Sequence, residues 1–114
     1  MKKVAIIGAG ISGLFIANLF KRNPNYKITI YEKNSSINSE ESYGIQLSVN
    51  SIKLLNKIEF NKFQNDKKFT PNKVNFFSNK NLNKICELNI ASFNTEDCKY
   101  TTLKRSTLIN FLKK

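Results

Sequence analysis

Histidine is absent from this chain of 114 residues, and glycine, cysteine and arginine are scarce. Without histidine the chain can hold no Ser-His-Asp triad, no histidine-ligated zinc and no haem bound through histidine. The two cysteines, Cys86 and Cys98, lie 12 positions apart, which matches neither a redox pair nor a metal knuckle. We interpret them as free thiols in a reducing compartment, and we predict no metal site.

Positive charge, in contrast, is abundant: 19 lysines and arginines oppose 8 acids, giving a formal net charge of +11. Such a balance raises nucleic acid or anionic membranes as partners. However, 17 of the 19 cations are lysines, and the chain also has 17 asparagines and 13 isoleucines. All three residue types have A- and T-rich codons, so coding bias explains much of the excess. We therefore expect no nucleic-acid partner.

The N-terminus has the outline of an export signal, because Met1-Lys2-Lys3 precedes an apolar stretch at residues 4–20. Lys21 and Arg22 follow this stretch without a small-residue cleavage site, and three glycines interrupt it. Its 17 residues are also fewer than the roughly 20 that a membrane span needs. We expect neither export nor a membrane span, and therefore a cytoplasmic protein.

The hydrophobic pattern of the first third predicts an α/β fold. Residues 3–7 form a short apolar run, typical of a strand buried on both faces. Apolar positions recur with helical spacing over residues 11–21, and Pro24 cannot continue that helix. Residues 26–31 alternate in polarity, as in a second strand. The pattern predicts a Rossmann-like βαβ unit over residues 3–32 with parallel strands.

The rest of the chain predicts shorter elements. They are a polar loop at 34–42, a helix near 50–58, a polar connector at 61–73, extended segments within 73–90 joined as a hairpin across 79–81, a strand at 100–104 and a C-terminal helix at 107–113. Ser106 or Thr107 is the expected N-cap of that last helix.

Three of the four glycines form one motif, Gly8-Ala9-Gly10-Ile11-Ser12-Gly13, between the first predicted strand and helix. Gly8 permits the tight turn, Gly10 lets a pyrophosphate approach the backbone, and Gly13 lets the helix pack closely on the strand. Backbone N–H groups at the helix start, including those of Ile11 and Ser12, can hold phosphates together with the helix dipole. The motif predicts dinucleotide binding.

Glu32 ends the second predicted strand, 19 positions after Gly13. A carboxylate there can accept hydrogen bonds from the hydroxyls of an adenosine ribose and disfavours a 2′-phosphate. The site should therefore prefer FAD or NAD over NADP. We include Glu32 and the adjacent Lys33 among the cofactor-binding residues, although a solvated strand end also explains Glu32.

Two further segments resemble those of FAD-dependent monooxygenases of the aromatic hydroxylase type, which include salicylate, 4-hydroxybenzoate and ubiquinone-pathway hydroxylases. Gly44 begins a stretch that resembles the family's G-I-x-L-x-x-N segment, and Arg105 begins one that resembles its R-x-x-L segment. The resemblance implies FAD as cofactor, with Gly44 close to the flavin and Arg105 in contact with FAD. It further implies NAD(P)H as reductant, O₂, and an aromatic or related small molecule as substrate.

Both residues have simpler explanations. Gly44 also fits an ordinary turn, and Arg105 a surface cation at a helix start. Arginine is nevertheless rare here, with two against 17 lysines, so a planar bidentate donor is a plausible requirement at position 105.

The chain also departs from the resemblance. Family members run several hundred residues, and this chain lacks their middle D-G segment, their later G-D segment and most of the substrate-binding sheet. The loop at 39–42 carries Glu40 and Glu41, where relatives often have an arginine. We interpret residues 1–114 as the N-terminal part of an FAD-binding domain, inactive alone, and we assign no catalytic residue. It is a truncated product, half of a split enzyme with a complementing chain, or a partial reading frame.

Two other interpretations remain open. The chain could belong to a different Rossmann-type NAD or FAD oxidoreductase, or it could be a non-enzymatic remnant or basic binding module. A parallel sheet of two strands leaves its edges and faces uncovered, so we expect marginal stability or aggregation for the segment alone.

Overall fold

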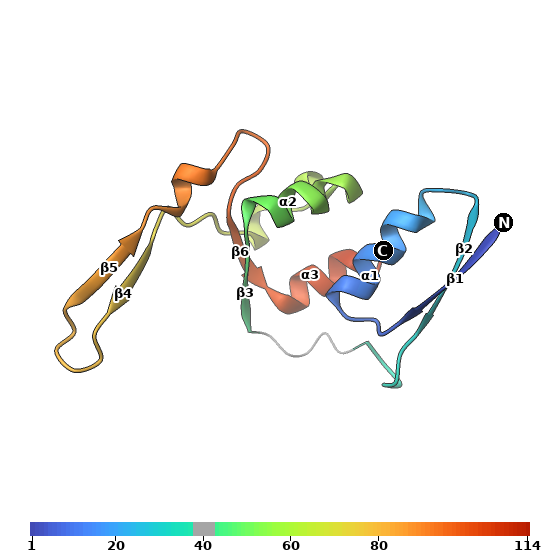
Figure 1. Ribbon diagram of the computed structural model, residues 1–114, viewed down its shortest axis with the longest axis horizontal. Helices are drawn as coiled ribbons and strands as arrows, with labels where there is room; N and C mark the ends of the chain where they lie inside the picture. The colour runs from blue at the N-terminus through green and yellow to red at the C-terminus, as the bar shows by residue number, and fades with distance from the viewer. Residues whose placement is uncertain (38–42) are drawn as a thin grey trace.

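The computed structural model describes residues 1–37 and 43–114, so the segment with Glu40 and Glu41 lies outside the described residues. The molecule is elongated, with principal extents of 59 × 33 × 23 Å. A parallel strand pair lies at one end, a β-hairpin at the other, and the helices between them (Figure 1). No helix in the described part of the chain has the length and apolar character needed to cross a membrane.

The first third is the predicted βαβ unit, formed by β1 (Lys2–Ile7), α1 (Ile11–Lys21) and β2 (Tyr26–Tyr31). The two strands are parallel and in register from Lys2 opposite Tyr26 to Ile7 opposite Tyr31. This arrangement confirms the predicted α/β, Rossmann-like class.

The prediction that the first strand is buried on both faces is wrong. Val4 and Ile6 are half-buried, but Ala5 between them is exposed and Ile7 is 82% exposed. Within the described residues β1 pairs only with β2, and α1 lies against both strands. Since strand side chains alternate between faces, one helix covers only one set of them.

The middle of the molecule joins segments that are distant in sequence. The strand β3 (Gly44–Leu47), which the sequence pattern did not reveal, pairs antiparallel with β6 (Thr101–Lys104). Each strand leads into a helix: β3 into α2 (Val49–Leu55) and β6 into α3 (Arg105–Leu112).

The start of α3 corrects the capping prediction. Its N-cap is Lys104, without a side-chain hydrogen bond, and neither Ser106 nor Thr107 caps it. Because β6 runs directly into the helix, the first helical N–H, that of Arg105, donates to the carbonyl oxygen of Tyr43 at 2.9 Å instead. The Tyr43 carbonyl oxygen therefore satisfies one of the N–H groups that have no partner within the helix.

The helix predicted near 50–58 is shorter than expected. It ends at Leu55 and continues as a 3₁₀ turn, Asn56–Ile58. Glu59 then takes a left-handed conformation with φ of 69° and ends that turn. The predicted polar connector contains two more 3₁₀ turns, Phe60–Lys62 and Asn65–Lys67.

The hydrophobic core lies where α1, α2, α3 and β6 meet. Leu108 and Ile109 of α3 are completely buried, and Phe60 is 1% exposed. A polar contact also joins two helices in this region, since the Asn18 side-chain amide donates to the Leu112 carbonyl oxygen at 2.7 Å. The core therefore depends on residues from both ends of the chain.

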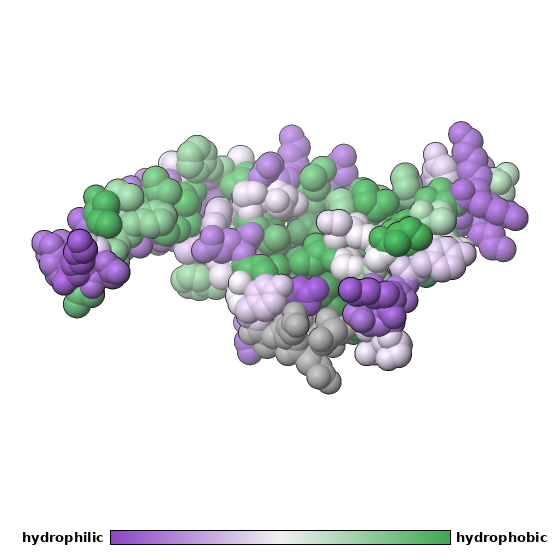
Figure 2. All heavy atoms as spheres, turned by 60° about the horizontal axis from the view of Figure 1, so that its bottom comes forward, coloured by the Kyte–Doolittle hydropathy of each residue, from purple (hydrophilic) through white to green (hydrophobic). Residues whose placement is uncertain are grey.

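The predicted hairpin is present as β4 (Val74–Phe77) and β5 (Lys84–Leu88), paired antiparallel with a register shift after Phe76. It projects away from the helices (Figure 1), and every residue of β5 is exposed. Hydrophobic side chains therefore reach the surface at this end of the molecule (Figure 2).

Candidate functional site

The glycine motif forms the turn between β1 and α1, and two of its glycines are required by geometry. Gly8 has a φ of 96°, a conformation that side chains disfavour, and its N–H donates to the Tyr31 carbonyl oxygen at 2.7 Å. A Cβ on Gly13 would lie 2.0 Å from the carbonyl oxygen of Gly8. Gly13 therefore allows α1 to pack directly against the turn, as its spacing predicts.

Gly10 differs from Gly8 and Gly13, because the surrounding structure does not require a glycine at this position. It is exposed, it is the N-cap of α1, and a Cβ there would meet no atom within 4 Å. No side chain caps α1, and no acid lies in its first turn. The N–H groups of Ile11, Ser12 and Gly13 have no carbonyl four residues earlier within the helix. This open, uncapped helix start can receive an anion.

Glu32 stands beside this turn and is bonded to it. One carboxylate oxygen, Oε2, accepts a hydrogen bond from the Ala9 N–H at 2.7 Å, and Oε1 accepts one from the Asn34 N–H at 3.1 Å. These backbone donors, that of Ala9 foremost, lower the pKa of Glu32 below its ordinary value, and the adjacent Lys33 contributes to the same shift. The strand end thus holds an ionised carboxylate at the glycine turn.

Gly44 and Arg105, far apart in sequence, are brought together by the β3–β6 pair. Gly44 lies opposite Lys104, the residue before Arg105. Gly44 is part of a strand, so the ordinary-turn explanation for it is wrong. A Cβ on Gly44 would also meet no atom within 4 Å, which leaves an open surface there.

Tyr43 completes this second group and was missed by the sequence reasoning. The Arg105 guanidinium carbon lies 5.8 Å from the centre of the Tyr43 ring, a distance suited to a cation–π contact. Tyr43 is 55% exposed. Its position next to Gly44 in the segment that resembles the hydroxylases was the available signal.

The glycine turn and the β3–β6 pair both pack against the same hydrophobic core. Ala9 of the glycine turn and Leu103 of β6 belong to the same buried cluster, against which Ile11 and Ile45 also pack. The arrangement offers anion-binding N–H groups, one carboxylate and one guanidinium. Among the described residues, no group of three or more cysteines and acids is placed to hold a metal ion.

Residues 6–47 match the family model of an NAD(P)-binding Rossmann-like domain. No curated protein sequence matches the chain significantly. Those 42 residues comprise the glycine turn, α1, β2 and β3, the part of the chain that carries the predicted dinucleotide site.

Solved structures of two other proteins share the fold of nearly the whole chain. An FAD-containing monooxygenase from Photorhabdus luminescens subsp. laumondii superposes with a TM-score of 0.74 at 24% identity, covering 100% of this chain and 28% of its own. The 2,6-dihydroxypyridine-3-hydroxylase from Arthrobacter nicotinovorans gives 0.68 at 15% identity, covering 96% and 25%.

These superpositions define the class of fold. The chain has the Rossmann-like α/β fold found in FAD-containing monooxygenases and aromatic hydroxylases, which confirms the predicted resemblance at the level of the fold. It spans about a quarter of the length of these two structures.

Proposed function

We propose that this chain binds the adenosine diphosphate part of FAD, as the N-terminal part of a monooxygenase that hydroxylates an aromatic or related small molecule with NAD(P)H and O₂. The observation that carries the proposal is the Glu32 carboxylate, hydrogen-bonded to Ala9 beside the uncapped start of α1. Because the chain spans about a quarter of the similar structures, activity requires parts that they have and the described residues lack.

The residues at the turn fit such a ligand. The N–H groups of Ile11, Ser12 and Gly13, with the positive end of the helix dipole, would hold the pyrophosphate over Gly10. Each Glu32 oxygen accepts one backbone hydrogen bond and keeps a second lone pair for a ribose hydroxyl. Its lowered pKa keeps the charge that repels a 2′-phosphate.

Arg105 and Gly44 would serve the flavin half of the cofactor. Arg105 begins α3, beside the β3–β6 pair that contains Gly44. Its planar guanidinium can donate two parallel hydrogen bonds to an anionic or carbonyl group of the cofactor. The open surface at Gly44 would let the cofactor approach the β3 backbone. FAD, when bound, supplies the redox chemistry, and the protein residues position it.

A second candidate is an NAD-binding oxidoreductase, favoured by the description of the matching family model. Both candidates use the same turn and the same Glu32. They differ in whether a flavin stays bound when the missing parts are present, in a longer polypeptide or in a complementing chain. Retained yellow flavin absorbance supports the monooxygenase, whereas a colourless protein that binds NAD⁺ supports the alternative.

The turn itself is tested by calorimetric titration of the chain with ADP, a probe that lacks the flavin. Gly10→Val should reduce ADP affinity more than tenfold, because its side chain would occupy the space proposed for the pyrophosphate. Gly44→Val is the matched control: it too has open space at its Cβ, and it should leave ADP affinity unchanged. Equal ADP affinity in the wild type and Gly10→Val would contradict the proposal.

A further inference from the structure

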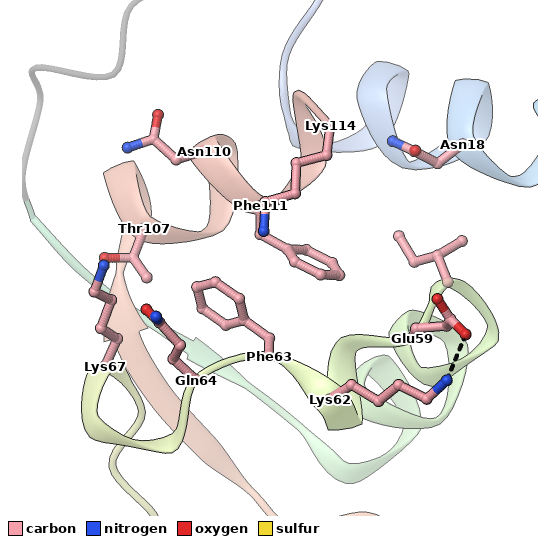
Figure 3. Close-up of a pocket in the computed structure, with 11 residues that line it drawn as sticks. Asn18, Glu59, Lys62, Phe63, Gln64, Lys67, Thr107, Asn110, Phe111 and Lys114 are labelled. Carbon is pink, nitrogen blue, oxygen red and sulfur yellow. Dashed lines mark hydrogen bonds and ion pairs between the residues drawn. The ribbon is translucent and has the colours of Figure 1, made fainter.

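A cleft of about 510 Å³ lies between α3 and the chain over residues 58–67 (Figure 3). On the α3 side its lining residues are Thr107, Asn110, Phe111 and Lys114. The spacing of three and four places Thr107, Asn110 and Phe111 on one face of α3, and Lys114 follows the end of the helix. The α1 residue that reaches the cleft, Asn18, lies seven positions beyond Ile11, or about 10 Å along the helix from the glycine turn. The cleft is therefore separate from the glycine turn.

Aromatic rings form the floor of this cleft. The ring centroids of Phe63 and Phe111 are 5.1 Å apart, with the ring planes inclined by 55°. Both rings are half-buried, so each keeps an accessible surface, and the buried Phe60 supports them with centroids at 5.9 and 5.2 Å. Ile58 extends the apolar lining. Such a floor suits a flat aromatic molecule, which can stack against one ring and meet the edge of the other.

Positive charge surrounds the floor. Lys62, Lys67 and Lys114 line the cleft, together with a single acidic side chain, that of Glu59. Lys62 already binds Glu59 through an ion pair of 2.7 Å, so these two charges offset each other. Lys67 and Lys114 are left in excess, and the Nζ of Lys114 stands 5.8 Å from the Phe63 ring centroid. The side-chain amide of Asn110 adds a hydrogen-bond donor on the α3 side.

From these features we propose that the cleft is a second ligand site, which takes a planar aromatic anion such as an aryl carboxylate. Its ring stacks on Phe63 and Phe111, and its carboxylate pairs with Lys67 and Lys114. The volume falls within the range of small-molecule sites and accommodates one or two fused rings. This site does not depend on cofactor binding at the glycine turn.

The test uses the full chain, labelled with ¹⁵N and titrated with 2-naphthoate or its neutral counterpart 2-naphthamide, with chemical shifts followed by NMR. Naphthoate should shift the amides of residues 58–67 and 107–114 and bind at least about fivefold more tightly than naphthamide. Lys67→Gln should weaken naphthoate binding by about twofold to fivefold, the range for an exposed ion pair. Lys80→Gln, in the turn of the hairpin, carries the same charge change away from the cleft and should have no effect.

Three results would overturn the proposal: equal affinity for naphthoate and naphthamide, shifts that map to the hairpin, or full naphthoate affinity in Lys67→Gln. The first of these would identify simple adhesion to apolar surface. Because Lys67 is exposed, its substitution should not perturb folding, and a dispersed spectrum of the variant verifies this. ADP affinity should be the same with and without naphthoate, which keeps the outcome separate from the test of the glycine turn.

Discussion

The body around α3 and the β4–β5 hairpin contain similar apolar residues in opposite surroundings. Ile109 is completely buried, whereas Ile85 in the hairpin is 70% exposed, and the same contrast separates Leu108 from Leu88, which is 53% exposed. The body joins α1, α2, α3 and β6, so its contacts span the chain. The hairpin is held by pairing between two strands that are close in sequence.

This difference indicates where the stability of the molecule resides. Burial of apolar surface stabilises the body, whereas the hairpin has little burial to offset the entropy of ordering. A two-stranded hairpin is marginal alone, so it should open locally at low free energy while the body remains folded. The four predictions that follow test this contrast, from the largest expected effect to the smallest.

Shortening one isoleucine in each region should give very different costs. Ile109→Ala should lower the free energy of unfolding by about 2–5 kcal/mol, because it removes buried methyl groups and leaves a cavity. Ile85→Ala, the matched change in the hairpin, should alter it by less than about 0.5 kcal/mol. Urea denaturation followed by circular dichroism measures both. Comparable costs would show that the hairpin is packed against something in solution, such as a second copy of the chain.

The glycine turn allows a similar comparison within the body. Gly13→Ala should cost about 1–3 kcal/mol of unfolding free energy, since its Cβ would lie 2.0 Å from a backbone oxygen. Gly10→Ala should cost less than about 1 kcal/mol, the effect of a poorer helix N-cap, because its Cβ has free space. The same urea experiment tests the pair. An equal loss in both variants would mean that space at the turn is not what distinguishes these glycines.

The βαβ unit could be predicted from the sequence because its determinants are local. The motif from Gly8 to Gly13 and the alternation in residues 26–31 each lie within one element or turn. The pairing of Gly44 with Lys104 was not accessible in that way, because four-residue strands carry little pattern and their partners are far apart in sequence.

The candidate site likewise combines local features, which the sequence predicts, with contacts between distant segments, which it does not. Spacing alone predicted Glu32, but its hydrogen bond to Ala9 depends on the parallel register of β1 and β2. The association of Tyr43 with Arg105 required the β3–β6 pair. The capping error at Ser106 and Thr107 arose because a strand can supply the carbonyl oxygen that meets the first helical N–H.

Low pH should reduce the free energy of unfolding through protonation of Glu32, beside the glycine turn. Its pKa is lowered in the folded state, so its ionised form stabilises the fold above the ordinary pKa of 4.5, and this stability is lost as pH falls through the lowered value. Glu32→Gln removes the charge. The urea midpoint of the wild type should therefore exceed that of the variant at pH 7, and the difference should shrink steadily towards pH 3. A difference that does not change with pH would show that the carboxylate acts through its shape alone.

The smallest effect is expected from the charges of the hairpin. Glu87 forms ion pairs with Lys73 at 3.1 Å and Lys84 at 3.0 Å, and these pairs lower the pKa of its exposed carboxylate. Because exposed pairs contribute little, Glu87→Gln should leave the urea midpoint of the whole chain unchanged and only speed hydrogen exchange of amides within residues 74–88.

Lys80→Gln is the control for this experiment, since Lys80 forms no ion pair within the described part of the chain. It should leave the exchange rates of the hairpin at their wild-type values. Faster exchange in α3 as well as in the hairpin of Glu87→Gln would contradict the separation of the two regions. In that case the hairpin would have to open and close together with the core and would not be an independent unit.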